Sequence, residues 1–376
     1  MKIVAIETSV VSLPFEMGGP HPSFAGVPWT KLDILLVKVE TEDGLIGWGE
    51  CFGHVSIPAT KTALDTVVAP LVLGRDAANI QALSDFVLPA VHLLGRNGPF
   101  VFAYSGIEIA LWDLAGKRTG QPLHRLLGSE GSQNALPAYA SLLRYGDPKL
   151  VAINTAAACA QGYQHIKLHE LTVEAVVAAK TAPGAAAAKI MLDVNCAWSV
   201  AQACEMADAL KPMGLLWLEE PVWPPEDCEG LAVARQRGIP IAAGENVAGL
   251  HGFRSLIKAG AIDIAQPSVT KIGGVGEVMN VIRDCRLHGI GFAPHSPYFG
   301  PGLLATMHIC AATMSDPLVE VLWIDMEANP FDPWVRVRDG HVNLPPGPGL
   351  GCEPDPTVME RYVTGAPVRH ELRGAA

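Results

Sequence analysis

HIK (165–167), IMLD (190–193), LLWLE (215–219) and IPIAAGE (239–245) are four short apolar runs that each end in a charged residue. These end residues are Lys167, Asp193, Glu219 and Glu245, each 26 positions after the last. The intervals are long enough for a helix and two loops, so the runs indicate successive strands of a (β/α) barrel. Because such barrels carry their chemistry at the C-terminal ends of the strands, we expect the four side chains to converge.

Three of the four end residues are carboxylates, and three converging negative charges require a cation. Asp193, Glu219 and Glu245 offer oxygen ligands without His or Cys, which favours Mg²⁺ or Mn²⁺ over Zn²⁺. A single strand-end acid is more often a solvated loop residue or a helix N-cap. The equal spacing of three such acids, each after an apolar run, favours a metal site.

Further polar side chains lie at predicted strand ends. Side chains alternate along a strand, so His169 faces the same way as Lys167, and Asn195 the same way as Asp193. We expect Asn195 to reach a bound substrate. His295, in GFAPHSP, ends another apolar run and is expected to face the Lys167/His169 pair from the far side of the barrel.

Three more candidates are expected to bind substrate. Glu320, in DPLVEVLW, ends the next strand and can form a hydrogen bond with a bound acid. Lys271, in SVTKIGG, lies just past a strand end and fits a site cation or a plain loop lysine equally well. His21 lies in the glycine- and proline-rich loop 17–22, which fits a mobile lid or an ordinary surface turn.

The chain divides into three predicted parts. Residues 1–125 alternate in polarity like an antiparallel meander and continue into helical patterns, which predicts an α+β domain. Residues 126–336 alternate short apolar runs with helical stretches and form the predicted barrel. Residues 337–376 are rich in proline and glycine, and we expect them to pack back on the first domain. The strands expected in the barrel are 137–142, 164–169, 189–194, 214–219, 239–244, 263–267, 289–294 and 318–323.

Composition excludes several classes of protein. Hydrophobic content of 49% and charged content of 17% suit a compact enzyme that buries a subunit interface, so we expect a homo-oligomer. The net charge of −11 argues against nucleic acid as a partner. We see no signal peptide, no membrane span and no CxxC pair among the eight cysteines, so a cytoplasmic protein with free thiols is expected.

Common nucleotide and hydrolase motifs are missing from the sequence. The glycines at 273, 274 and 276 match neither GxxxxGK[ST] nor GxGxxG, so they predict no phosphate loop. Neither GxSxG nor HExxH occurs, which removes the corresponding hydrolase and protease hypotheses.

The motifs resemble, in order and over nearly the whole chain, those of the mandelate racemase/muconate lactonizing branch of the enolase superfamily. ALWDLAGKRTGQPLHRLLG (110–128) is similar to the family's linker helix, and KLH, LDVN, WLEEP, AAGEN and KIGGV are similar to its barrel motifs. The resemblance implies an N-terminal α+β capping domain on a modified (β/α)7β TIM-type barrel. It also implies one Mg²⁺ held by Asp193, Glu219 and Glu245, and removal of the proton α to a substrate carboxylate through a metal-stabilised enediolate.

The resemblance assigns roles to the other candidates. Lys167 resembles the lysine that contacts the substrate carboxylate, and Glu320 the glutamate that donates to one of its oxygens. His169 takes the place of the second lysine of the family's KxK, which is the base on one face. His295 resembles the histidine base of the racemase subgroup, but Ser268 stands where that subgroup has an aspartate behind the histidine.

Ser268 favours one reaction over the others. An aspartate behind a histidine raises its basicity and fixes its tautomer, whereas serine adds no charge. His295 is then suited to donate a proton and His169 to remove one, which fits β-elimination. We therefore predict dehydration of a hydroxy or sugar acid to a 2-keto acid. The alternatives are a racemase or epimerase, which needs two competent bases, and a catalytically silent barrel that binds an acid.

Overall fold

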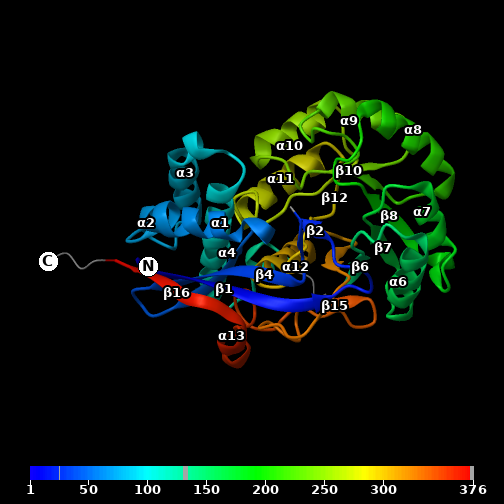
Figure 1. Cartoon of the computed structure of the whole chain (residues 1–376). Helices are drawn as coiled ribbons and strands as arrows, with labels where there is room; N and C mark the ends of the chain where they lie inside the picture. Colours follow the sequence, from blue (N-terminus) through cyan, green and yellow to red (C-terminus); the bar gives the residue numbers. More distant parts are fainter. Residues whose placement is uncertain (25, 130–133, 373–376) are drawn as a thin grey trace.

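The computed structural model describes residues 1–24, 26–129 and 134–372. It has an N-terminal sheet with helices and, beside it, a ring of parallel strands surrounded by helices (Figure 1). This arrangement confirms the predicted fold class, a (β/α) barrel with an N-terminal α+β domain. In the described part of the chain, no helix is both long enough and apolar enough to cross a membrane.

The N-terminal sheet is an antiparallel meander of β1 (Ile3–Glu16), β4 (Lys31–Thr41) and β5 (Ile46–Cys51). The turn from β4 to β5 is closed by Thr41, whose hydroxyl donates to Asp43 Oδ1 at 2.6 Å. Gly44 completes the turn with φ +82°, a conformation that favours glycine. A small hairpin, β2 (Ser23–Phe24) with β3 (Val27–Pro28), extends from the end of β1.

Both faces of this sheet are buried. Leu35, Val37 and Val39 pack against the domain's own helices. Ile34 and Leu36 point the other way and join the core that continues into the barrel. Because side chains alternate along a strand, the two faces of one sheet contribute to two different cores. The sheet therefore holds the capping domain against the barrel. Its helices are α1 (Ile57–Ala63), α2 (Ala69–Val72), α3 (Ile80–Ala90) and α4 (Pro99–Thr119), with one π-helical turn, Leu64–Val68, joining α1 to α2.

The barrel strands lie in the order β12-β11-β10-β9-β8-β7-β6-β13 and are all parallel. Seven helices follow the first seven strands, which is the (β/α)7β pattern. The strands are β6 (Ala135–Ser141), β7 (His165–Leu168), β8 (Lys189–Asp193), β9 (Leu218–Glu219), β10 (Ile241–Ala243), β11 (Ile264–Ala265), β12 (Gly291–Phe292) and β13 (Val319–Leu322). The helices are α6 (Pro148–Ala160), α7 (Val173–Lys180), α8 (Val200–Leu210), α9 (Cys228–Arg235), α10 (Gly249–Lys258), α11 (Val275–Leu287) and α12 (Pro301–Thr313). A short helix, α5 (Leu123–Leu126), precedes the barrel.

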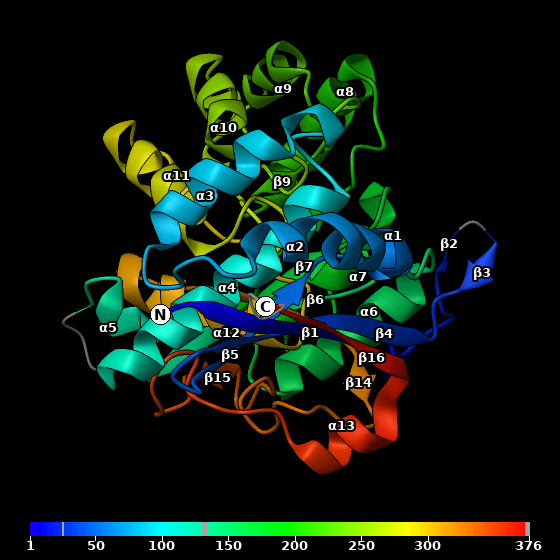
Figure 2. The same ribbon diagram turned by 90° about the vertical axis from the view of Figure 1, so that its left-hand side faces the viewer.

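The last part of the chain touches both domains. β15 (His341–Asn343) pairs antiparallel with β6 of the barrel. After α13 (Pro356–Tyr362), β16 (Val363–Glu371) pairs antiparallel with β1, and the two strands lie side by side in Figure 2. β14 (Asp325–Met326) pairs with the far end of β1. The first strand is therefore held by segments from the end of the chain.

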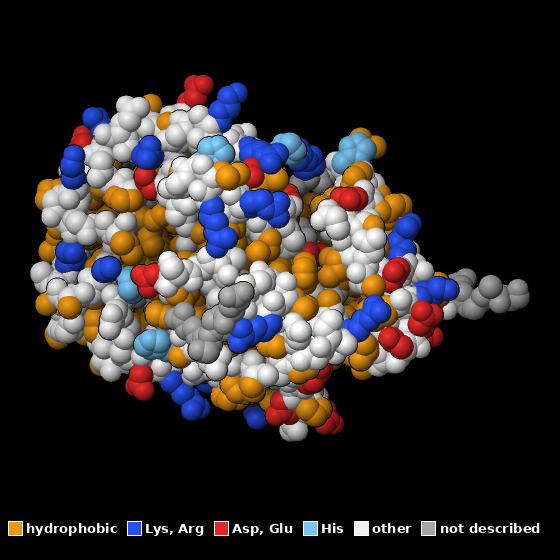
Figure 3. Space-filling view, turned by 180° about the vertical axis from the view of Figure 1, so that it is seen from behind, with side chains coloured by type: hydrophobic (Ala, Val, Ile, Leu, Met, Phe, Trp, Pro, Cys, Tyr) orange, Lys and Arg blue, Asp and Glu red, His pale blue; other side chains and the backbone are white. Residues whose placement is uncertain are grey.

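The face of the molecule seen in Figure 3 carries charges of both signs. In the view of Figure 3, Lys and Arg side chains are interspersed with Asp and Glu, and hydrophobic side chains lie exposed between them.

Candidate active site

Four charged side chains meet at neighbouring strand ends of the barrel. Lys167 at the end of β7 is wholly buried, and its Nζ lies 2.6 Å from Glu219 Oε1 on β9. The same nitrogen lies 2.8 Å from Glu320 Oε1 on β13 and 3.4 Å from Asp193 Oδ2 on β8. The predicted convergence of Lys167, Asp193 and Glu219 therefore occurs, and Glu320 joins them.

The two histidines lie against two of the predicted ligand acids. His295, just after β12, has its Nε2 at 2.6 Å from Oε2 of Glu245, which follows β10. His169, just after β7, has its Nε2 at 3.2 Å from Asp193 Oδ2. The other nitrogen of His169 lies 2.6 Å from the carbonyl oxygen of Leu142. A carbonyl can only accept, so His169 Nδ1 carries a hydrogen and Nε2 is the nitrogen turned to the site.

Hydrogen bonds orient the three acids. Trp217 Nε1 donates to Glu219 Oε2 at 2.8 Å, and Asn246 Nδ2 donates to Glu245 Oε1 at 3.0 Å. Asn195 donates to Asp193 Oδ1 from its backbone nitrogen at 2.8 Å and from its side chain at 3.1 Å. The other oxygen of Asp193, Oδ2, is buried and has the ion-pair contacts to His169 at 3.2 Å and to Lys167 at 3.4 Å.

The pKa values of the site carboxyl groups are shifted by burial and by the small number of cations among them. Burial raises the pKa of Glu219 well above its ordinary value, and Lys167 offsets this in part. Burial also opposes ionisation of Asp193, but Lys167 and His169 outweigh it and lower the pKa of that carboxyl. Burial and the nearby Glu245 raise the pKa of Glu220, the next residue along from Glu219, to about 7. The cluster thus has an excess of acidic groups.

The donor chemistry of the cluster fits a hard divalent cation. Among the described residues, no three His, Cys, Asp or Glu side chains are already arranged as a ligand set. Glu219 and Glu245 are turned instead to Lys167 and His295. The acids nevertheless follow neighbouring strands, with Asp193 directly beside Glu219 in the β8–β9 register, and Asp193 Oδ2 is buried between Lys167 and His169. These residues can therefore hold Mg²⁺ by exchanging their ion pairs for the metal.

Two further candidates from the sequence, Lys271 and His21, lie outside the cluster of acids around Lys167. Lys271 lies with its Nζ 4.8 Å above the ring of Phe52 and donates to Asn246 Oδ1 at 3.2 Å, beside Glu245. His21 lies in the capping domain, where its Nδ1 is 3.1 Å from the carbonyl oxygen of Trp29 and its ring packs edge-on against Phe15. Its role as a substrate contact stays a prediction.

Several residues of the site were not identified from the sequence. Ser141 donates to Glu320 Oε1 at 2.8 Å, and Trp217 holds Glu219. Trp217 lies two positions before Glu219, so the alternation of side chains along a strand predicts that both face the same side. Tyr298 lies behind Ser268 and His295, and no sequence pattern pointed to it. His54 is a different case, because the resemblance already implied that the segment 51–54 closes over the substrate. It begins a 3₁₀ turn, His54–Ser56, with φ +38°, and its pKa is lowered to about 4 by burial and by His295 and Lys271.

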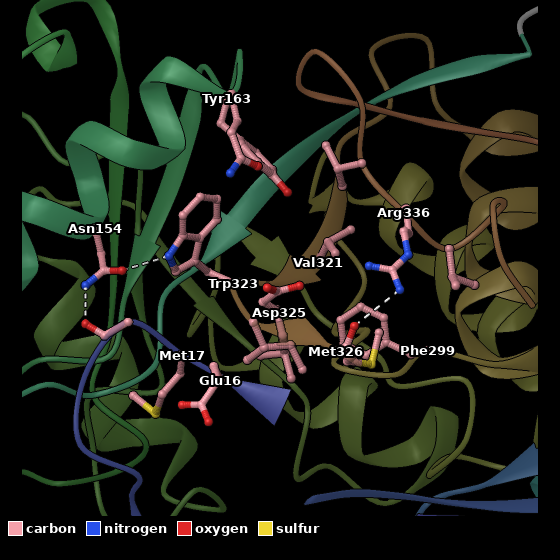
Figure 4. A pocket seen from close by; sticks show the side chains of 16 residues that line it. Glu16, Met17, Asn154, Tyr163, Phe299, Val321, Trp323, Asp325, Met326 and Arg336 are labelled. Carbon is pink, nitrogen blue, oxygen red and sulfur yellow. Dashed lines mark hydrogen bonds between the residues drawn. The ribbon is translucent and has the colours of Figure 1, made fainter. Parts of the chain in front are cut away.

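A pocket of about 510 Å³ lies outside this cluster. It is lined by the end of β1, α6, the residues around β13 and β14, and the segment near Arg336 (Figure 4). Val321, which lines it, points to the opposite side of β13 from Glu320. Trp323 donates to Asn154 at 2.9 Å, so these polar groups bind one another. The acids, lysine and histidines of the strand ends do not line this pocket.

Comparison with protein families gives two matches that follow one another along the chain. Residues 5–128 match the mandelate racemase/muconate lactonizing enzyme N-terminal domain. Residues 151–358 match the enolase C-terminal domain-like family.

Curated relatives and solved structures agree with these matches. D-galactarolactone cycloisomerase of Agrobacterium fabrum is 29% identical, over 94% of this chain and 96% of that protein. Arabinonate dehydratase of Saccharolobus solfataricus is 28% identical, over 90% of this chain and 92% of that protein. The structure of L-talarate dehydratase from Polaromonas sp. JS666, in complex with Mg and L-glucarate, superposes with a TM-score of 0.82 at 26% identity, covering 99% of both chains.

Proposed function

We propose a function for this chain from the family to which it belongs, the mandelate racemase/muconate lactonizing enzyme family of the enolase superfamily. It is an enzyme that removes the proton α to the carboxylate of a small acid. The reaction that its residues support best is β-elimination, in the form of dehydration of a hydroxy or sugar acid to a 2-keto acid. Relatives named as arabinonate and galactonate dehydratases support this assignment.

We assign Asp193, Glu219 and Glu245 as ligands of one Mg²⁺, with Mn²⁺ as a substitute. The support is the oxygen-only donor set, the position of these acids on neighbouring strands, and the Mg in the L-talarate dehydratase complex. When bound, the ion offsets the negative charge that develops on the substrate carboxylate as the α-proton leaves. Lys167, already surrounded by acids, is placed to bind the substrate carboxylate, and Glu320 to form a hydrogen bond with it.

His169 is the proposed base. Its Nδ1 hydrogen is fixed on the carbonyl of Leu142, which sets the ring orientation and leaves Nε2, now 3.2 Å from Asp193 Oδ2, as the nitrogen that takes the α-proton. Loss of that proton converts the acid into an enediolate.

His295 is the proposed acid. It lies after β12, across the barrel from His169 on β7, and gives its Nε2 proton to the β-oxygen as the Cβ–O bond breaks. The leaving group departs as water, and the enol that remains rearranges to the 2-keto acid. The substrate must therefore carry oxygen on both the α- and β-carbons. Lys271, Asn195 and His21 are proposed to bind its more distant hydroxyls.

Cycloisomerization is the second candidate, because the D-galactarolactone cycloisomerase of Agrobacterium fabrum is among the relatives. It begins with the same α-proton removal, but the leaving β-oxygen stays in the molecule as part of a ring. Racemization or epimerization is less favoured, since it requires His295 to remove a proton and Ser268 adds no charge to help it. A silent acid-binding barrel would not need the acids, lysine and two histidines together.

The two histidines give the test. The enzyme is incubated with Mg²⁺ and a library of sugar acids and hydroxy acids, and 2-keto acid formation is measured. In deuterated solvent, His169→Ala should abolish exchange of the α-proton, whereas His295→Asn should slow elimination but permit exchange. If each variant instead loses exchange with one enantiomer only, the enzyme is a racemase. If exchange survives in His169→Ala and is lost in His295→Asn, then His295 and not His169 is the base.

Two further properties are proposed from composition. The high apolar content supports a homo-oligomer, and the free cysteines support a cytoplasmic enzyme. Gel filtration with light scattering tests the first, and fractionation of cells that express the chain tests the second.

A further inference from the structure

The cavity of about 510 Å³ beside β13 has no part in the proposed reaction. Each of the first seven barrel strands is followed by a helix on the outside of the barrel, whereas β13 is the last strand and is followed directly by β14. Val321, on the outer side of β13, is met instead by α6, β14 and the segment near Arg336, and the cavity lies between them (Figure 4). The cavity is therefore a consequence of the (β/α)7β pattern and lies on the opposite side of β13 from Glu320.

Aromatic side chains form one wall of this cavity. The ring of Trp323 packs edge-on against that of Tyr163, with centroids 5.9 Å apart. The indole nitrogen of Trp323 donates to Asn154 Oδ1 at 2.9 Å, which fixes the ring. The buried apolar residues of the wall are Phe299, Val321, Met326 and Val335. A ligand that fills the cavity therefore needs an apolar body.

The hydroxyl group of Tyr163 is a polar group without a partner. The residue is 6% exposed, lines the cavity and points into it (Figure 4). Its hydroxyl forms no hydrogen bond within the described part of the chain, and burial raises the pKa of the phenol. Because buried hydroxyl groups are normally hydrogen-bonded, this one is an available partner for a polar group of a ligand.

Two carboxylates give the mouth of the cavity a negative charge. Glu16 and Asp325 line it and are paired residues in the β1–β14 register, so their side chains lie next to each other. Among the described residues, Asp325 has no side-chain hydrogen bond or ion pair, and Glu16 has only His21, at 3.4 Å. Arg336, which also lines the cavity, is already bound to Asp332 at 2.8 Å. Like charges directly opposite each other destabilise a sheet, so a cation between the two acids would be stabilising.

We propose that this cavity binds a small organic cation, with its ammonium group at Glu16 and Asp325 and its apolar body against Trp323. The phenol oxygen of Tyr163 accepts a hydrogen bond from the same ligand. Aromatic rings and carboxylates together attract an organic ammonium group, whereas a metal ion such as Ca²⁺ takes six to eight oxygen ligands. The site is separate from the acids and histidines of the strand ends, so it does not depend on the proposed function.

The indole signal of Trp323 tests binding directly. The full chain is labelled with ¹⁵N-tryptophan and titrated, in the presence of Mg²⁺, with phenethylammonium as the probe. The signal of Trp323, one of eight tryptophans, is the one that disappears in Trp323→Phe. We expect it to shift and saturate, while the signal of Trp217, which donates to Glu219 in the active site, stays in place. No saturable shift of Trp323, or a shift of Trp217 in its place, would overturn the proposal.

Two analogues of similar size test the charge of the ligand. In 2-phenylethanol a neutral hydroxyl replaces the ammonium group, and in 3-phenylpropanoate a carboxylate replaces it. We expect both to bind at Trp323 roughly five- to thirtyfold more weakly than phenethylammonium, because a cation–π contact and exposed ion pairs each contribute a few-fold. Equal affinities of the cation and the alcohol would show a cavity that selects only apolar bodies, and would overturn the proposal.

Removal of the two charges tests the acids. The variant Glu16→Gln/Asp325→Asn changes two exposed positions, so its fold should be retained. It should bind phenethylammonium roughly tenfold more weakly and 2-phenylethanol as before, since only the cation uses the charges. Glu174→Gln, an exposed acid on α7, is the control and should change neither affinity. An equal loss for both ligands would mean that the acids only shape the cavity, which contradicts the proposal.

Tyr163→Phe tests the hydroxyl group. The variant should bind phenethylammonium about two- to tenfold more weakly, the range for one hydrogen bond, while its stability to urea stays unchanged because the hydroxyl has no internal partner. The matched control is Tyr145→Phe, whose lost hydroxyl donates to the carbonyl oxygen of Met17 at 2.8 Å, and which should be less stable. If Tyr163→Phe keeps full affinity, or is destabilised as much as Tyr145→Phe, the role given to Tyr163 is wrong.

Discussion

At the scale of single residues, Lys167 organises the centre of the site. A buried, unpaired ammonium group would cost several kcal/mol, and its three carboxylate partners offset that cost. The same contacts restrain Asp193, Glu219 and Glu320, whose mutual repulsion is otherwise large in a dry interior. The lysine therefore stabilises the geometry that the proposed ion would share.

Glu219→Gln tests the proposed metal ligand. The amide keeps the volume of the side chain but loses the charge, so Mg²⁺ affinity should fall at least tenfold, in the range of other metal-site substitutions. Folding should persist, because Lys167 keeps Glu320 and Asp193 as partners. Titration calorimetry measures the affinity, and urea unfolding the stability. Glu229→Gln, an exposed acid in the first turn of α9, is the control. Unchanged affinity in Glu219→Gln would remove this residue from the ligand set.

At the scale of elements, α11 depends on a side chain from another domain. Its N-cap residue, Gly274, has no side chain to satisfy the first backbone nitrogens. Glu108 of α4 replaces the cap, accepting from Val275 at 2.7 Å and from Gly276 at 2.9 Å. A Cβ on Gly274 would lie 2.0 Å from Glu108 Oε2, so this glycine is needed for the close approach. The contact joins the linker helix α4 to the barrel.

Glu108→Ala should destabilise the protein by about 2–3 kcal/mol, because it removes two hydrogen bonds and leaves the backbone nitrogens of a buried helix end without an acceptor. Glu108→Gln, which retains one oxygen acceptor, should lose less. Both are measured by urea unfolding against Glu174→Ala, an exposed acid in the first turn of α7. If Glu108→Ala is no less stable than Glu174→Ala, the cap across the domain boundary contributes nothing.

A second contact between elements depends on pH. His308 on α12 is fully buried, and its Nδ1 lies 3.0 Å from Nδ1 of His124 on α5. Its Nε2 lies 3.2 Å from the carbonyl oxygen of Leu350, so Nε2 donates and Nδ1 accepts. Burial lowers the pKa of His308 to about 3. As the pH falls, the unfolded chain therefore takes up a proton on His308 at a higher pH than the folded protein does. The stabilisation that neutral, buried His308 contributes is present above about pH 6.5 and is lost as the pH falls.

His308→Gln cannot take up that proton. At pH 7 the variant should be less stable than the parent, because it loses the bonds to His124 and Leu350. At pH 5 the difference should shrink by roughly 2 kcal/mol, since one proton is worth about 1.4 kcal/mol per pH unit below pH 6.5. Urea unfolding at both pH values measures this, with the exposed His288→Gln as control. A difference that does not change with pH would mean that His308 titrates normally in the folded protein.

What the sequence predicted follows from which properties are local. The apolar runs that end in Lys167, Asp193 and Glu219 predicted the strand ends, because burial and the alternation of side chains along a strand depend only on neighbouring residues. β9 is only Leu218–Glu219, shorter than the predicted 214–219, since an apolar run records burial and not backbone pairing. Tyr298 behind Ser268 could not be foreseen, because it depends on how the loop after β12 folds back.

At the scale of the whole molecule, one continuous core joins the two domains. The sheet of β1 and β4 contributes Leu13, Ile34 and Leu36 to the same cluster as the barrel strands. β1 is then covered on its outer edge by β16, from the far end of the chain. Arg369 of β16 adds ion pairs to Glu40 of β4 at 2.6 Å and to Glu371 at 2.8 Å. The final strand, which follows the barrel in the sequence, thus completes the sheet of the capping domain.

Deleting residues 363–376 should show that backbone pairing, and not the ion pairs, is what β16 contributes. The deletion exposes the edge of β1 from Ala5 to Val11, and an unpaired edge both weakens the sheet and pairs with other molecules. We expect a lower melting temperature and self-association that increases with protein concentration, measured by scanning calorimetry and light scattering. Arg369→Ala removes the ion pairs but leaves the strand, and should cost less than about 1 kcal/mol because these pairs are solvent-exposed. If Arg369→Ala proved as harmful as the deletion, the charges would hold β16 in place; if neither mattered, β1 would be stable as an edge strand without it.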